Sequence, residues 1–289
     1  MILEESIKRL QETVRYLSVE IGPRSYNDYE KLCQAAEYIS SRFKEYGYNV
    51  NEQPFVFQGK TYRNIIGNMP GLNEEEEILV LGAHYDTVSG SPGADDNASA
   101  VAGLLEVARL VSKSRVAPAI QFVAFALEEP PAYRTKNMGS YHYAQMLNKG
   151  RHKVFGMICL EMIGYFVDRP HSQEFPLPFM EKRFSDKGNF IAAVGNLRSR
   201  KFTEMVKEGF KEGTDIPIFS YNALPIVIGI DLSDHWSFYQ FGYPAVMITD
   251  TAFYRNPYYH TAKDIHDTLD YEKMAKVVYG VKAAIERLV

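Results

Sequence analysis

The sequence predicts one α/β domain, residues 1–289, built as a three-layer α/β/α sandwich around a central, mostly parallel but mixed sheet. Short apolar runs rich in β-branched residues alternate with longer runs whose apolar residues recur at helical spacing. The central short runs are apolar almost throughout, as expected for strands that helices cover on both faces. Neither an internal repeat nor a low-complexity linker divides the chain.

The elements follow from these patterns in chain order. Helices are predicted over 3–17 and 32–46, where apolar residues recur every three or four positions and Gly47 provides a stop. Further helices are predicted from Ala98, from Gly139, over Lys201–Lys211 and over Met274–Leu288. Strands are predicted over Ile78–Ala83, Ile120–Ala126, Phe155–Leu160, Phe190–Val194 and Ala245–Thr249. The acidic run Glu74–Glu77 precedes a strand and is interpreted as a solvated turn.

The composition excludes several classes of protein. A hydrophobic content of 46% and a charged content of 24% are typical of a globular chain rather than a disordered or fibrous one. A net charge of -4 gives no general attraction to nucleic acid or to an anionic membrane, so a small or neutral substrate is expected. Cys33 and Cys159 lie in predicted apolar elements and are expected to be buried, without a disulfide or a thiolate metal site.

The N-terminal residues lack the basic start and uninterrupted apolar run of a secretory signal. No stretch of the sequence has the length and hydrophobicity of a membrane span. We therefore expect a cytoplasmic protein that does not bind membranes.

Histidine and acidic residues follow three of the predicted strands. The first strand ends at His84-Tyr85-Asp86, the second continues into Glu128-Glu129, and the third ends at Glu161. Each of these residues alone is also compatible with an ordinary loop or core position. Because ligands bind at the carboxyl ends of strands in open α/β sheets, the three together predict a functional site at one sheet edge.

Two further segments offer metal ligands. Asp96 lies in Gly93-Ala-Asp-Asp-Asn-Ala-Ser99 before a predicted helix, where one acidic or amide residue can cap the helix while another binds metal. His260 lies in a turn-like segment before the last helix. Asp234 and His235 precede another strand and fit a supporting role or a packing role equally well.

The resulting donors are two histidines and three carboxylates, which suit Zn²⁺ and also Mn²⁺ or Co²⁺. Their charge balances two divalent ions better than one, because a single ion would leave the site anionic.

From about Leu79 to Asp264 the chain resembles zinc exopeptidases of the bacterial leucyl aminopeptidase and glutamate carboxypeptidase II superfamily. The resemblance rests on the order His-x-Asp, an Asp-rich stretch, Glu-Glu, a third carboxylate and a final His. Ile21-Gly-Pro-Arg24 is also similar to the N-terminal segment of that family. The resemblance implies a phosphorylase/hydrolase-like fold and a two-zinc aminopeptidase acting on small peptides.

The resemblance also implies a role for individual residues. One zinc would be held by His84, Asp96 and Glu161, and a second by Asp96, Glu129 and His260, with Asp96 bridging them. Glu128 would be the general base, Asp86 would orient His84, and Tyr259 would polarise the scissile carbonyl, with Tyr258 as a competing candidate.

Two features depart from the family pattern. The third-strand ligand is Glu161, where the family usually has aspartate, and the segment 130–138 is longer than the link in simpler relatives and is expected to form a rim over the site. The aromatic segment Tyr165–Gly188, with Phe166, Phe175, Phe179 and Phe184, is compatible with an apolar pocket or with core packing.

Three alternatives to an aminopeptidase stay open at this point. A glutaminyl cyclase shares the fold and much of the ligand set but uses one zinc. A dimeric amidohydrolase or carboxypeptidase has a similar ligand order but inserts a lid domain, for which the interval between Glu161 and His260 is short. A non-catalytic binding protein of the same fold would be expected to have lost ligands, and none is missing here.

Overall fold

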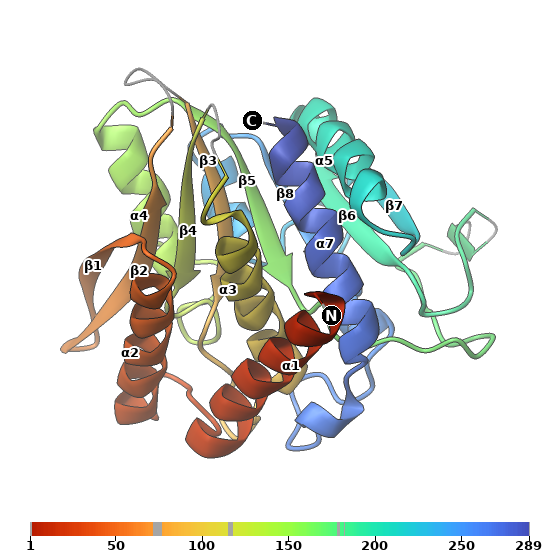
Figure 1. Cartoon of the computed structure of the whole chain (residues 1–289), viewed down its shortest axis with the longest axis horizontal. Helices are drawn as coiled ribbons and strands as arrows, with labels where there is room; N and C mark the ends of the chain where they lie inside the picture. Colours follow the sequence, from red (N-terminus) through yellow and green to blue (C-terminus); the bar gives the residue numbers. More distant parts are fainter. Residues whose placement is uncertain (1, 72–76, 115–117, 178–179, 182, 289) are drawn as a thin grey trace.

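The computed structural model describes residues 2–71, 77–114, 118–177, 180–181 and 183–288 (Figure 1). An eight-stranded sheet has the order β1-β2-β4-β3-β5-β8-β6-β7. Its strands are β1 (Asn49–Phe57), β2 (Lys60–Met69), β3 (Ile78–His84), β4 (Ala119–Phe125), β5 (Val154–Glu161), β6 (Ile191–Asn196), β7 (Ile218–Ala223) and β8 (Ala245–Thr249). Helices cover both faces of the sheet, which confirms the predicted α/β class.

The four central strands of the sheet are parallel, and the strand direction reverses on each side of them, although β6 and β7 are parallel to each other. Strands β4, β3, β5 and β8 run parallel to one another. On one flank β2 pairs antiparallel with β4 and with β1, and on the other β6 pairs antiparallel with β8. The four central strands therefore end at a single edge, which is where the predicted ligands lie.

The helices form two unequal layers (Figure 1). They are α1 (Ile2–Arg15), α2 (Tyr29–Glu45), α3 (Ala100–Val111), α4 (Gly139–Lys149), α5 (Arg200–Gly213), α6 (His235–Tyr239) and α7 (Tyr271–Leu288). Helices α1, α2, α3, α5 and α7 pack in the larger apolar core, while α4 and α6 cover the opposite face and form a smaller one. Among the helices that the structure describes, none is long and apolar enough to cross a membrane.

Every helix and strand predicted from the sequence is present, with bounds that differ by a few residues. The prediction missed β1, β2, β7 and α6. Strand β1 alternates irregularly between exposed and buried residues, and β7 has one buried residue, so neither carries the apolar pattern of a central strand. Residues 74–76 of the acidic run lie outside the described residues, and Glu77 is exposed.

The two cysteines are free thiols. Cys159 is buried in β5, and its sulfur lies 3.3 Å from the Ser233 hydroxyl. The expectation that Cys33 is buried is wrong. Cys33 is only partly buried because it lines a surface groove between α2 and the β1–β2 hairpin.

Arg24, from the Ile21-Gly-Pro-Arg24 segment, is fully buried and ties the N-terminal region to the loops around the sheet edge. Its guanidinium donates to the carbonyl oxygens of Tyr85 and Pro92 at 2.7 Å and of Gly93 at 2.9 Å. Tyr85 directly follows His84, and Gly93 lies three residues before Asp96. One buried cation thus holds both ligand-bearing loops by hydrogen bonds.

We expect Arg24→Met to lower the free energy of unfolding by about 3 to 5 kcal/mol, because it leaves several buried carbonyl groups without a donor. Urea unfolding monitored by circular dichroism measures the change. Arg15→Met, at an exposed position on α1, is the matched control and should change stability by less than about 0.5 kcal/mol. If Arg24→Met lowered the free energy of unfolding by less than about 1 kcal/mol, Arg24 would not be needed to hold the two loops together.

Candidate metal centre

The site is built at the carboxyl edge of three adjacent strands. His84 is the last residue of β3, and Glu161 is the last residue of β5. Glu128 and Glu129 follow β4 after Leu127, whose φ of 59° turns the chain away from the strand direction. Because β4, β3 and β5 are neighbours and parallel, these side chains converge.

The five predicted ligands form two overlapping groups. In the first, His84 Nε2 lies 3.5 Å from Asp96 Oδ1 and 3.3 Å from Glu161 Oε2. In the second, His260 Nε2 lies 3.1 Å from Asp96 Oδ2 and 3.2 Å from Glu129 Oε1. Within each group one ligand atom per residue lies within 4.8 Å of the others. Asp96 belongs to both groups and offers a different oxygen to each histidine.

The site gathers buried carboxylates whose negative charge is not balanced by nearby positive side chains, and this raises the pKa values of several groups. Burial raises the pKa of Glu129 to about 7, and the nearby Asp96 carboxylate adds to the shift. Burial alone would lower the pKa of His84, but the surrounding carboxylates, with Glu161 foremost, raise it well above its ordinary value. The pKa of His260 likewise rises to about 10, against the effect of burial, through its hydrogen bonds with Asp96 and Glu129.

The donor set and these charges fit a pair of divalent cations. Imidazole nitrogens and carboxylate oxygens are the ligands of catalytic zinc sites, and two cations would neutralise the clustered acids. Glu128 Oε1 is buried and accepts no hydrogen bond from the residues that the structure describes. That oxygen is therefore free to interact with a group entering the site.

Asp96 is held by residues far away in the sequence. The Asp264 carboxylate accepts hydrogen bonds from the backbone N–H groups of Asp95, at 2.9 Å, and Asp96, at 3.1 Å. The Asn97 side chain donates to Leu160 O at 3.2 Å and accepts from Met162 N at 2.9 Å, which ties this stretch to the end of β5. Sequence reasoning missed these supports.

The Asp-rich stretch could have capped the following helix, but no side-chain capping bond is formed there by the described residues. The Asp95 carboxylate instead accepts from Gly164 N at 3.1 Å and from Asn256 Nδ2 at 2.8 Å. The residue before α3, Ser99, makes no side-chain capping bond, and its hydroxyl donates to Asp95 O. The Asp95 side chain thus bonds to residues next to the candidate ligands instead of to the start of α3.

Asp86 contacts both the first histidine and the Glu128-Glu129 pair. His84 Nδ1 lies 3.2 Å from the Asp86 carbonyl oxygen and 3.5 Å from its carboxylate. The two carboxylate oxygens of Asp86 accept from the backbone N–H groups of Glu128 and Glu129, each at 3.0 Å. Asp86 therefore fixes the turn that presents both glutamates, a contact that the sequence pattern did not indicate.

The two candidate tyrosines occupy different places. The Tyr259 ring stacks on the His260 ring, with centroids 3.7 Å apart. Burial is the main cause that raises the pKa of Tyr259, and the charges of Asp96 and Glu129 add to the effect. The Tyr259 hydroxyl therefore stays protonated beside the cluster formed by the five candidate ligands. Tyr258 instead packs edge-on against Tyr165, with centroids 6.1 Å apart. The structure thus brings Tyr259, and not Tyr258, to the carboxylates.

Asp234 and His235 are buried at the start of α6. His235 Nε2 donates to Ile230 O at 2.8 Å, and burial lowers the pKa of His235 to about 4, so it is a neutral packing residue. Asp234 is fully buried, and burial raises its pKa to about 7; His84 and Glu161 are among the charges that act on it.

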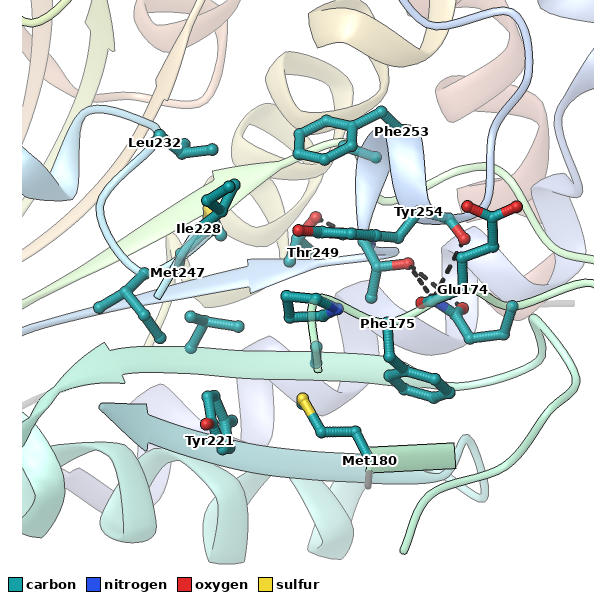
Figure 2. Close-up of a pocket in the computed structure, with 18 of the residues that line it drawn as sticks. Glu174, Phe175, Met180, Tyr221, Ile228, Leu232, Met247, Thr249, Phe253 and Tyr254 are labelled. Atoms are coloured by element: carbon teal, nitrogen blue, oxygen red, sulfur yellow. Dashed lines mark hydrogen bonds between the residues drawn. The ribbon is translucent and has the colours of Figure 1, made fainter. Parts of the chain in front are cut away.

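An apolar pocket opens beside the cluster, and Glu161 and Tyr259 form part of its lining. It has a volume of about 880 Å³ with its open mouth included. In Figure 2, Ile228 and Met247 lie on one side of the hollow, and Phe175 and Met180 lie on another. Glu174 is exposed at its margin.

The aromatic segment before β6 contributes both to this pocket and to packing. Phe175 and Phe184 line the pocket, whereas Phe166 packs beneath the Arg255 guanidinium at 5.7 Å. Phe179 lies outside the described residues.

Residues 64–285 match the family model described as Peptidase family M28. The chain belongs to this family. It is therefore a peptide hydrolase, as the resemblance predicted. Among its M28 relatives, Escherichia coli YfbL, an uncharacterised protein, is 42% identical over 284 residues, and the match covers 96% of this chain and 86% of YfbL. A probable leucine aminopeptidase of Trichophyton verrucosum is 27% identical, and the chain spans 63% of that protein's length.

Solved structures share the M28 fold. BSAP, a zinc aminopeptidase from Bacillus subtilis, superposes with a TM-score of 0.77 at 17% identity, covering 96% of this chain and 94% of BSAP. The Tannerella forsythia glutaminyl cyclase superposes with a TM-score of 0.70 at 22% identity, covering 97% of this chain and 98% of the cyclase. These likenesses show a common fold, and both activities occur on it.

Proposed function

We propose that this M28 protein is an aminopeptidase that uses two zinc ions to remove an apolar N-terminal residue from small peptides. The observation that carries the proposal is the pair of ligand groups that share Asp96, with Glu128 beside them. Support comes from the leucine aminopeptidase and zinc aminopeptidase named among its relatives. Mn²⁺ and Co²⁺ suit the same ligands and are expected to substitute for zinc.

His84, Asp96 and Glu161 would hold one zinc ion, and Asp96, Glu129 and His260 the other. Zinc supplies Lewis acidity, which polarises a peptide carbonyl and makes water a stronger nucleophile at neutral pH. Asp86 supports this arrangement through its contacts with His84 and with the backbone of both glutamates.

Glu128 is the general base in this proposal. Its Oε2 lies 3.9 Å from His84 Nε2, beside the first ligand group, and its Oε1 is free of hydrogen bonds from the described residues. Burial raises its pKa first of all, with Glu129 and Glu161 adding to the effect. A carboxylate of this kind accepts a proton from the attacking water and returns it to the leaving amine. Tyr259 donates a hydrogen bond to the scissile carbonyl as negative charge develops.

The pocket supports an apolar first residue. Its lining is dominated by aliphatic and aromatic side chains: Phe175, Met180, Phe219, Ile228, Met247 and Phe253. The pocket lining includes the candidate ligand Glu161 and the neighbouring Tyr259. When the substrate's first side chain fills the pocket, the peptide bond that follows it therefore lies next to the candidate ligands. Burial of apolar surface then favours leucine, methionine or phenylalanine at that position.

A substrate panel tests this function. Zinc-loaded protein should cleave tripeptides that begin with leucine or phenylalanine at least about tenfold better, in kcat/KM, than those that begin with aspartate or lysine. Liquid chromatography of the products measures the rates, and N-acetylated versions of the same peptides are the control.

Cleavage of the N-acetylated peptides but not of the free ones would refute an aminopeptidase. A glutaminyl peptide in the panel tests the cyclase alternative, which the fold of the Tannerella forsythia enzyme favours. Ring closure without hydrolysis would establish a cyclase, and no turnover with bound zinc would favour a non-catalytic binding protein.

A further inference from the structure

The floor of the apolar pocket is a row of side chains that crosses four strands of the sheet. Successive partners in the sheet register form this row: Glu161 on β5, Thr249 on β8, Ala192 on β6 and Phe219 on β7. All four residues line the pocket. Neighbouring strands are about 4.8 Å apart, so the floor extends about 14 Å from the strand of the candidate ligand Glu161 to β7.

A second row of lining residues makes the floor two side chains wide. Met247, Val194 and Tyr221 are also partners in the register and line the pocket, two positions before or after the residues of the first row. Figure 2 shows Met247 and Tyr221 on their strands at the floor of the hollow. Because side chains two positions apart on a strand share a face, both rows belong to one face of the sheet.

This face is open to a ligand over β6 and β7. The alternate residues of β6, Ile191 and Ala193, point to the other face and belong to the larger core. On the pocket face, α4 contacts β1 and β2, and α6 contacts β5 and β8. The pocket therefore occupies the part of the face that lies beside these helices, over the end of the sheet.

Ala192 lies in the middle of the first row and has its smallest side chain. Thr249 and Phe219, its partners on the two neighbouring strands, are both larger. A branched side chain at position 192 would stand between the near part of the pocket, next to Glu161, and the far part, next to Phe219. The methyl group of Ala192 thus keeps the two parts continuous.

The far part of the pocket ends at a packed aromatic wall. The Phe219 ring centroid lies 5.2 Å from that of Phe184 and 4.9 Å from that of Phe190, and all three rings line the pocket. At about 1.5 Å per carbon–carbon bond, a leucine side chain reaches only about 4 Å from its Cα, and tryptophan about 7 Å. A leucine at the candidate ligands therefore fills only the near part, whereas a large aromatic side chain extends toward the wall, where ring contacts are favourable.

We propose that Ala192 is a specificity-determining residue that opens the far part of the pocket to a large aromatic first residue, tryptophan above all. This inference rests on the proposed aminopeptidase function and deepens it. The substrate class it names is peptides that begin with tryptophan or phenylalanine, in preference to those that begin with leucine.

The test compares tripeptides that differ only in the first residue. For zinc-loaded wild-type protein, kcat/KM for Trp-Gly-Gly should exceed that for Leu-Gly-Gly at least about fivefold, because tryptophan buries more apolar surface. Ala192→Leu should lower kcat/KM for Trp-Gly-Gly at least about twentyfold, and that for Ala-Gly-Gly less than about twofold, since only the large side chain needs the far part.

Ala223→Leu is the matched control. Ala223 lies on β7 and lines a separate hollow rather than the pocket, so the same substitution there should alter neither rate. Circular dichroism and zinc content establish that each variant is folded and loaded. If Ala192→Leu fails to fold, Ala192→Val should show the same selective loss to a smaller extent, because a β-branched residue suits a strand.

Equal losses on Trp-Gly-Gly and Ala-Gly-Gly in a folded, zinc-bound variant would overturn the proposal, because they would assign position 192 to the cluster or to the fold. Unchanged turnover of Trp-Gly-Gly would overturn it as well, and so would a wild-type preference for Leu-Gly-Gly, which needs no variant. Failure of zinc-loaded wild-type protein to cleave any of the three peptides would instead refute the proposed aminopeptidase function, so the two kinds of failure are distinguishable.

Discussion

Glu128→Gln is expected to retain the wild-type zinc content and to lose nearly all turnover, with kcat reduced at least about a thousandfold. The amide has almost the same shape as the carboxylate but cannot accept a proton at neutral pH. Glu128 belongs to neither of the two ligand groups, so its replacement leaves His84, Asp96, Glu129, Glu161 and His260 in place. The Asp86 bond to Glu128 uses the backbone N–H and survives the substitution.

The measurements are zinc content by elemental analysis and kcat for a leucyl tripeptide. Glu20→Gln, at an exposed position, is the matched control and should keep full activity. If Glu128→Gln instead lost zinc together with activity, Glu128 would be a ligand. Retention of more than about a tenth of the turnover would show that another group accepts the proton.

The convergence of most of the candidate metal ligands could be predicted because they lie at points that the chain marks locally. His84 and Glu161 end strands with strong apolar patterns, and the Glu128-Glu129 pair follows a third such strand. Parallel strands with covering helices then dictate that these ends share an edge. His260 has no comparable local signal, and only the order of the family motif singled it out.

The supports around the ligands could not be predicted because they depend on contacts between distant segments. Asp264 holds the backbone of Asp96 from 168 positions away, and no spacing rule relates the two. The pairing of Arg134 with Asp231 joins two loops 97 positions apart. The apolar pocket likewise combines residues from segments around Phe175, Phe219 and Met247. Such contacts depend on tertiary packing, which pattern reasoning along the chain does not specify.

Glu161 shows how the departure from the family pattern is accommodated. Its longer side chain still reaches His84, with 3.3 Å between Oε2 and Nε2. The same oxygen accepts the hydroxyl of Ser233 at 2.5 Å, which fixes the additional methylene in one orientation. The longer ligand is therefore held by a neighbour on the segment that also carries Asp231.

Asp96→Asn is expected to remove both zinc ions, whereas His260→Ala is expected to remove only one. Asp96 contributes one oxygen to each ligand group, whereas asparagine has a single neutral oxygen that cannot serve both, and His260 belongs to one group only. Three protein ligands are the usual minimum for a tight catalytic zinc site. Zinc content should fall from about two per chain to below about 0.2 in Asp96→Asn and to about one in His260→Ala, with turnover lost in the first.

Thermal unfolding of Asp96→Asn provides an independent test, because bound metal stabilises the folded protein whereas repulsion between the buried carboxylates destabilises it. A chelator should lower the Tm of wild-type protein, since ligands that bind only the folded state stabilise it. Asp96→Asn should be insensitive to chelator. Its metal-free form should also be at least as stable as metal-free wild type, because one charge has been removed from the crowded carboxylates. A variant that kept two zinc ions would show that Asp96 is not a metal ligand. If metal-free Asp96→Asn were much less stable than metal-free wild-type protein, Asp96 would instead be needed for the fold.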